Sequence, residues 1–130
     1  MTINHIYNVL NELLNQQQLP LEATVDRYFA ADYQQKTNGH WDDRENFIRH
    51  MCYLREILIS AEITVLDELR EGDRYATRHQ VTANKRDGSR VVMEVYMFAT
   101  LDTEGRFTRI EETTLLLEGN ETDRGMGNAK

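Results

Sequence analysis

Hydrophobic and polar residues alternate in four runs through the second half of the chain, between Glu62 and Glu118. The runs are rich in Val, Thr, Tyr, Phe and Met, and short polar segments separate them at residues 71–73, 86–88 and 102–105. Each segment contains a glycine, which reaches positive φ angles at low cost, and an aspartate, which can hydrogen-bond its own backbone. The pattern predicts an antiparallel meander of four strands joined by hairpins, with a bulge in the first strand near Leu66.

The first half of the chain instead places apolar residues three and four positions apart, which is the spacing of one helix face. We expect three helices, over residues 2–18, from 21 to about 32, and from about 44 to 58. Thr2 suits the N-cap of the first helix, and Asp42 or Asp43 suits that of the third, where Asp42-x-x-Glu45 resembles a capping box. Asn38-Gly39 predicts a turn before the third helix.

The last three predicted strands each have about 12 residues, or roughly 40 Å at about 3.3 Å per residue. Strands of this length in a small domain must twist and curl. Helices packed in the concave side of such a sheet leave a cone-shaped interior, where small-molecule pockets commonly lie. The expected fold class is therefore α+β, with three N-terminal helices packed in a curled four-stranded antiparallel sheet.

A chain of 130 residues can form one domain with its own core, and we assign residues 1–119 to it. Residues 120–130 are polar and contain glycine, so we expect a flexible C-terminal tail. The formal net charge is −7 and the basic residues are scattered, which argues against nucleic-acid and anionic-membrane partners. No apolar stretch approaches the roughly 20 residues that span a bilayer, and no signal pattern begins the chain. We therefore expect a cytoplasmic protein.

Four local motifs add to this pattern: ADY at residues 31–33, FIRHMCYLR at 47–55, EGDRYATR at 71–78 and EGRFxxIxE at 104–112. Together with three helices followed by a curled meander, they resemble the nuclear transport factor 2-like (NTF2-like) superfamily, and within it the SnoaL-like, polyketide-cyclase-like branch. The resemblance covers about residues 1–119. It implies a small-molecule pocket and dimerisation through the sheet face, in a superfamily that holds isomerases, cyclases, epoxide hydrolases, dehydratases and proteins that only bind.

Two histidines and one glutamate are the candidate acid–base residues. His50 shares the apolar stripe of the third helix, so it is either a core histidine with one hydrogen bond or a catalytic group. His79 falls in the more apolar phase of its strand and Arg78 in the opposite phase. Alternation sends Glu111 and Glu112 to opposite faces, and the resemblance favours Glu112 as the inward one. His5 is expected at the surface.

Four further residues are candidate ligand contacts. Glu94 interrupts an apolar run at residues 91–97, so it lies either in the pocket, where desolvation would raise its pKa, or on the outer face. Trp41 precedes the third helix and is either a lid contact or plain packing. Tyr28 and Tyr33 offer the hydroxyl groups that a steroid isomerase uses, without a spacing that secures that arrangement.

The leading hypothesis is a SnoaL-like pocket protein and, if catalytic, a proton-transfer enzyme acting on a small hydrophobic carbonyl ligand without metal or organic cofactor. No Cys/His spacing fits zinc, and the single cysteine, Cys52, rules out an internal disulfide. The rival hypothesis is a non-enzymatic ligand-binding or dimerisation domain. It would form a homodimer through the sheet face, with apolar area from Tyr96, Phe98 and Leu116.

Overall fold

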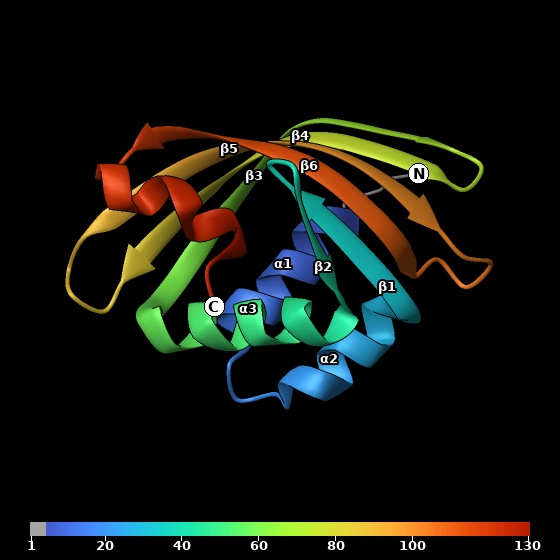
Figure 1. Ribbon diagram of the computed structural model, residues 1–130, viewed down its shortest axis with the longest axis horizontal. Coiled ribbons are helices and arrows are strands. Elements are labelled where there is room, and N and C mark those ends of the chain that lie inside the picture. The colour runs from blue at the N-terminus through green and yellow to red at the C-terminus, as the bar shows by residue number, and fades with distance from the viewer. Residues whose placement is uncertain (1–4) are drawn as a thin grey trace.

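The computed structural model describes residues 5–130 and packs three helices in the concave side of a curled sheet, so the expected α+β class is confirmed (Figure 1). The helices are α1 (His5–Asn15), α2 (Leu21–Tyr28), α3 (Arg44–Ile57) and the 3-10 helix η1 (Glu121–Asn128). The strands are β1 (Phe29–Thr37), β2 (His40–Asp43), β3 (Leu58–Glu71), β4 (Arg74–Lys85), β5 (Arg90–Leu101) and β6 (Phe107–Glu118). Among residues 5–130, no helix combines the length and the apolar character needed to cross a membrane.

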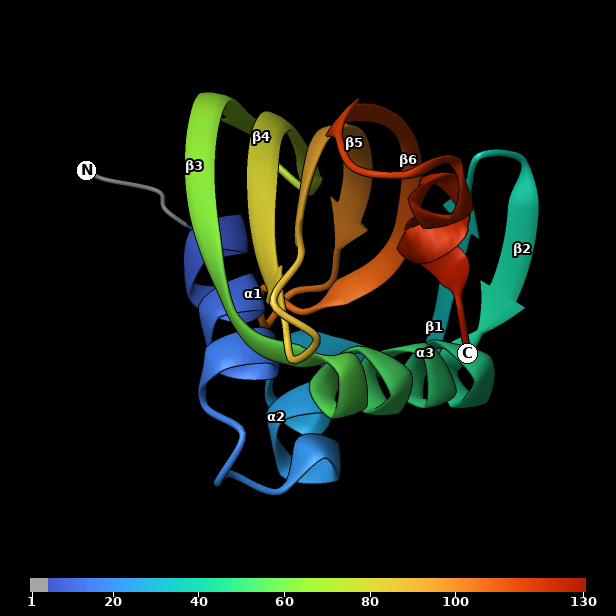
Figure 2. The ribbon, with the colours of Figure 1, turned by 90° about the vertical axis from the view of Figure 1, so that its left-hand side faces the viewer.

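The sheet has six strands in the order β2-β1-β6-β5-β4-β3. Strands β3 to β6 form the predicted antiparallel meander, and β1 adds to its edge in parallel with β6. Figure 2 shows these strands arching over α1 and α3, with η1 beside β6 and β2. The sheet therefore has two strands more than the four expected, and one of its pairings is parallel.

The extra strand β1 occupies residues that the helix pattern extended to about 32. Helix α2 ends at Tyr28, and from Tyr33 onward β1 alternates between buried and exposed residues. Its buried positions hold Gln35 and Thr37 as well as Tyr33, so the inward face is largely polar in sequence. A period of two is difficult to detect when the inward residues are not apolar.

The turn and cap expectations have mixed outcomes. Asn38 and Gly39 both have positive φ, 51° and 87°, as a two-residue hairpin turn requires, so the predicted turn is confirmed. Asp43 is the N-cap of α3, and its carboxylate accepts a hydrogen bond from the Asn46 backbone N–H at 2.9 Å. The capping box on Asp42 is wrong, because that carboxylate is buried and paired elsewhere. The expected cap on Thr2 lies outside the described residues.

Strand phase follows the predicted alternation. The pairing of β3 with β4 shifts register between Val65 and Asp67, which confirms the bulge. In β5 the inward face carries only apolar side chains at residues 91, 93, 95, 97, 99 and 101, all of them buried, while Tyr96 and Phe98 face outward. The inward face of the sheet therefore covers the helices and forms most of the core.

Where composition predicts a loose tail, residues 121–128 form the 3-10 helix η1. Asn120 caps it through a reciprocal pair of hydrogen bonds with Asp123. Asp123 also forms an ion pair with Lys85 of β4 at 2.8 Å, and Lys130 pairs with the buried Asp42 at 3.0 Å. These contacts hold the segment against the open side of the arch.

Candidate functional site

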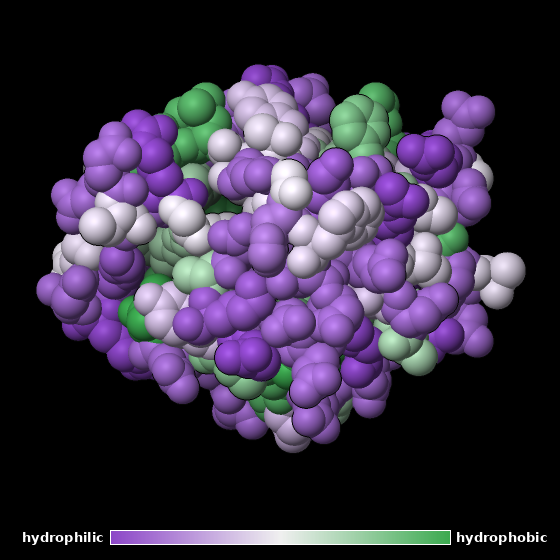
Figure 3. Space-filling model, viewed as in Figure 1, coloured by the Kyte–Doolittle hydropathy of each residue, from purple (hydrophilic) through white to green (hydrophobic). Residues whose placement is uncertain are grey.

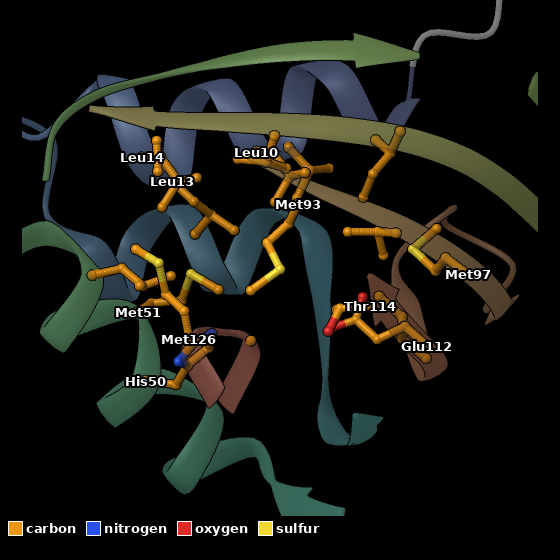
Figure 4. A pocket seen from close by; sticks show the side chains of 18 of the residues that line it. Leu10, Leu13, Leu14, His50, Met51, Met93, Met97, Glu112, Thr114 and Met126 are labelled. Atoms are coloured by element: carbon orange, nitrogen blue, oxygen red, sulfur yellow. The ribbon is translucent and has the colours of Figure 1, made fainter. Parts of the chain in front are cut away.

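A cavity of about 120 Å³ lies between the concave face of the sheet and helices α1 and α3. Its wall is mainly aliphatic and includes Leu10, Leu13, Leu14, Met51, Met93 and Met97 (Figure 4). Five lining residues have polar side chains: Gln35, His50, His79, Glu112 and Thr114. Among residues 5–130, neither a lysine nor an arginine lines the cavity. The structure thus brings together the three residues expected to be catalytic.

Glu112 projects from β6 into the cavity (Figure 4). Its carboxylate Oε1 accepts hydrogen bonds from Thr37 Oγ1 at 3.0 Å and from Gln35 Nε2 at 3.2 Å. The side chain keeps accessible surface because it borders the cavity, although protein surrounds it on all sides. Burial raises its pKa to about 7, partly opposed by the hydrogen bond from Thr37. Near neutral pH this carboxyl group can therefore both accept and return a proton.

Tyr33, expected to bind ligand, hydrogen-bonds Gln35 and does not line the cavity. Its hydroxyl group donates a hydrogen bond to Gln35 Oε1 at 2.6 Å, and the side chain is fully buried. Burial and then the nearby Glu112 raise the pKa of the Tyr33 phenol well above its ordinary value, so it remains a donor. Its place is in the support of Glu112.

His79 reaches the cavity from β4, as its strand phase predicts, while Arg78 faces outward and pairs with Asp67 at 2.8 Å. The ring Nδ1 lies 2.8 Å from Thr77 Oγ1. Burial lowers the pKa of His79 to about 4. The imidazole is therefore neutral near pH 7, so it can donate from one ring nitrogen and accept at the other.

His50 lies in the cavity wall at the end opposite Glu112, beside Met126 (Figure 4). Its Nδ1 is 2.6 Å from the backbone oxygen of Ala129, and because a carbonyl oxygen only accepts, Nδ1 carries a hydrogen. Burial lowers the pKa of His50, which leaves Nε2 of the neutral ring unprotonated. One hydrogen bond thus satisfies a core histidine that also borders the cavity.

The segment after β6 completes the cavity wall with Met126 and Gly127. A Cβ atom on Gly127 would lie 3.2 Å from Thr37 Cγ2 and 3.4 Å from Thr114 Cγ2. Glycine is therefore needed for this close approach beside the Glu112 carboxylate. The polar composition of residues 120–130 did not predict that this segment contacts the cavity.

The remaining candidates lie outside the cavity. Glu94 occupies the outer face, the second of the two alternatives, because the inward phase of β5 is wholly apolar. It accepts hydrogen bonds from Tyr96 and Gln80, which hold its pKa below the ordinary value. Trp41 is 44% exposed on β2, with Arg109 over its ring at 5.0 Å. It lies on the outside because β2 is the far edge of the sheet.

Tyr28 also does not line the cavity. Its ring packs edge-on against His5, with 6.2 Å between the centroids. The expectation that His5 is a surface residue is wrong, because its ring also packs against Tyr75 and Phe107. Burial is the main cause of its lowered pKa. This cluster lies at the N-terminal end of α1.

Sequence reasoning missed Gln35, Thr37, Met126 and Gly127. The signal available for the first two was the alternation Tyr33, Gln35, Thr37, which becomes clear once β1 is recognised as a strand. Within the described part of the chain, no group of three or more His, Cys, Asp or Glu side chains is placed to hold a metal ion.

In a comparison with known families, the model of the SnoaL-like domain matches residues 10–110. A curated relative, an uncharacterized protein of Schizosaccharomyces pombe, is 30% identical over 103 residues, which are 79% of this chain and 78% of that protein. The match confirms the resemblance that the local motifs suggested.

Solved structures with this fold include two bacterial proteins. A candidate SnoaL-like polyketide cyclase from Shewanella denitrificans has a TM-score of 0.68 at 9% identity, covering 85% of this chain and 87% of that one. An NTF2-like protein of unknown function from Exiguobacterium sp. has a TM-score of 0.65 at 15% identity, covering 84% and 97%. At such identities these likenesses show the fold alone.

Proposed function

Since the chain belongs to the SnoaL-like domain family and has the NTF2-like fold, we propose that it binds a small, uncharged, hydrophobic carbonyl compound and transfers a proton on it. The observation that carries this proposal is Glu112, a carboxyl group with a pKa of about 7 at the wall of an apolar cavity. A general base is most effective when its pKa lies near the working pH. The single cysteine fits a reducing compartment, which supports a cytoplasmic site of action.

The cavity wall supports an uncharged ligand. Its aliphatic side chains offer no counter-ion, and among residues 5–130 neither a lysine nor an arginine lines it to pair with an anion. The lowered pKa values of His50 and His79 keep both rings neutral near pH 7. A ligand carboxylate would lose its hydration without compensation, and an ammonium group could pair only with the Glu112 carboxylate, which would then not act as the base. Methionines in the wall can adjust to the shape of an aliphatic ligand.

The chemistry we propose uses Glu112 and His79. Ionised Glu112 removes a proton from the carbon beside the carbonyl, and the electron pair of that C–H bond moves to form an enolate. His79 donates a hydrogen bond from Nε2 to the enolate oxygen when Thr77 donates to its Nδ1. If the ligand has a carbon–carbon double bond conjugated with the enolate, the far carbon takes the proton from Glu112, which is isomerisation. Alternatively the enolate carbon attacks a second carbonyl carbon of the same molecule, and the alkoxide formed from that C=O bond takes the proton from Glu112, which is cyclisation.

The test is hydrogen exchange at carbon in deuterated water. The protein is incubated with a panel of 1,3-diketones and cyclic ketones, and deuterium at the carbon beside the carbonyl is measured by NMR. We expect exchange above the buffer rate with at least one probe, falling by at least about 100-fold in Glu112→Gln. Exchange that is equal in both proteins, or absent with every probe, would refute the enzymatic proposal.

The non-enzymatic alternative rests on the outer face of the sheet. Phe98 is 63% exposed there, next to Tyr96, and β6 adds Leu115 and Leu117, whereas Leu116 packs toward the core. Figure 3 shows a mainly hydrophilic surface on which two separate groups of hydrophobic side chains lie at the upper edge and others lie at the lower left and bottom. We propose that two copies pair through the outer face of the sheet.

Sedimentation tests this pairing. A dimer at micromolar concentration that dissociates in Phe98→Asp is expected, and a wild-type monomer at that concentration would contradict it. Ligand retained in native mass spectrometry by a protein without exchange activity would favour the binding function over the enzymatic one.

A further inference from the structure

We infer that Thr37 and Gln35 position Glu112 by occupying its Oε1, which leaves Oε2 as the oxygen that gains and loses the proton. Both donors lie on β1, whose Thr37 is the register partner of Glu112 in β6. No other group among residues 5–130 hydrogen-bonds this carboxylate, and Oε2 has no protein partner there. The role of Oε2 in catalysis rests on the proposed function, whereas the hydrogen bonds to Oε1 do not depend on it.

The direction of each hydrogen bond follows from the donors and acceptors present. Tyr33 donates to Gln35 Oε1 at 2.6 Å, which orients the amide. The Gln35 amide nitrogen then donates to Thr37 Oγ1 at 2.9 Å and to Glu112 Oε1. Thr37, having accepted that bond, turns its own hydrogen to Glu112 Oε1. All hydrogens in this network point toward the carboxylate.

Burial makes this direction stable. Tyr33, Gln35 and Thr37 are buried, so water does not replace any of these bonds. In the reversed amide orientation the Tyr33 hydroxyl would face an NH₂ group, and two oxygens would face each other at Glu112. Reversal would thus leave buried polar groups unpaired, which costs about 1–3 kcal/mol for each group.

Oε1 accepts from two donors, at 3.0 and 3.2 Å, and these hydrogen bonds make it the less basic of the two oxygens. Oε2 keeps its lone pairs free beside the cavity. Hydrogen bonds to the ionised form also stabilise it, so this network opposes the effect of burial on the pKa of Glu112. Without the Thr37 hydroxyl the carboxyl group would remain protonated to higher pH, so a smaller fraction of it would be ionised and able to accept a proton near neutrality.

The test measures the pKa of Glu112 in the ligand-free protein. Carbon-13 NMR of labelled glutamate carboxyl groups is followed against pH, and the Glu112 signal is the one lost in Glu112→Gln. We expect Thr37→Val to raise this pKa by about one unit, the size of a hydrogen bond to a charged group. Thr37→Ser should restore it. Thr24→Val, a buried threonine whose hydroxyl bonds only the Pro20 carbonyl, should leave it unchanged.

Gln35→Met is the second variant, since it keeps the side-chain length and removes the other donor. If Thr37→Val does not fold, Gln35→Met decides, and an unchanged pKa in the folded variants overturns the inference. With an active probe, the pH midpoint of exchange should move with the pKa, which a merely structural role would not cause. A shifted pKa in a protein that exchanges no probe would support the positioning and reject the proposed chemistry.

Discussion

Thr37 and Glu112 are direct partners across the one parallel pairing of the sheet, and 3.0 Å separates the threonine hydroxyl from the carboxylate Oε1. Along the chain, four further strands and α3 lie between β1 and β6, so the contact exists only in the assembled fold. The carboxyl group with the pKa near neutrality is therefore controlled by the strand whose inward face is polar. The following predictions test this site and the wall around it.

The first prediction concerns stability at alkaline pH. Folding raises the pKa of Glu112 from 4.5 to about 7, so between these values the folded state binds more protons than the unfolded state and stability falls as pH rises. The loss reaches about 3 kcal/mol above pH 7. Glu112→Gln removes this pH-dependent loss. The free energy of unfolding of the variant minus that of wild type should therefore be more positive at pH 8 than at pH 4.5. Urea unfolding at both values measures this, and an equal difference at the two would contradict it.

The second prediction concerns His79, whose effect on stability appears at acidic pH. Folding lowers its pKa from 6.5 to about 4, so the unfolded state binds more protons between these values and stability is lost on acidification. The full effect is about 3 kcal/mol below pH 4. His79→Gln should therefore weaken the rise of stability between pH 4 and 6.5. His40→Gln, at an exposed residue, is the control and should keep the wild-type slope.

Gly127 and Gly125 form a matched pair in η1. A Cβ on Gly127 would crowd Thr37, whereas one on Gly125 would meet nothing within 4 Å. We expect Gly127→Ala to destabilise the protein by about 1–3 kcal/mol, as overpacking does, and Gly125→Ala to have a much smaller effect. Thermal and urea unfolding measure the stability of both variants. Equal losses of stability would show that the close contact between Gly127 and Thr37 is not tightly packed.

Tyr33→Phe removes the hydroxyl group that orients Gln35. The buried Gln35 Oε1 loses its donor, so we expect a loss of about 1–3 kcal/mol in the free energy of unfolding. Tyr96→Phe removes a comparable donor to Glu94 at the outer face, where water can replace it, and should cost less. A larger loss in Tyr96→Phe would contradict the assignment of the buried network.

The sequence carried enough information to predict the meander and the phase of its residues. Alternation in β4 favoured His79 as an inward residue because its neighbours two positions away are the more apolar set, and the structure places it inward and Arg78 outward. In β6 alternation only separated Glu111 from Glu112, and the family resemblance selected Glu112, which lines the cavity. Alternation in β5 could not decide the side of Glu94, since both phases contain apolar residues. Burial of the opposite phase in the assembled sheet decides it.

The missed parts share one physical cause. In β1 and η1 a few specific polar contacts, rather than an apolar stripe, fix the structure. Gln35 is buried because Tyr33 and Glu112 satisfy its amide, and η1 is held through Asp123 and Lys85. Such pairings join residues far apart in the chain, so composition and periodicity do not reveal them.

All methionines in the described part of the chain line the cavity: Met51, Met93, Met97 and Met126. Oxidation converts the methionine thioether to a polar sulfoxide, so oxidant damage of this kind would fall on the cavity wall and spare the outer surface. The wall would change from a hydrocarbon-like lining to one that prefers water, while the sheet and its hydrogen bonds remain. Methionine oxidation would thus change what the cavity can hold, and methionine sulfoxide reductases could restore it.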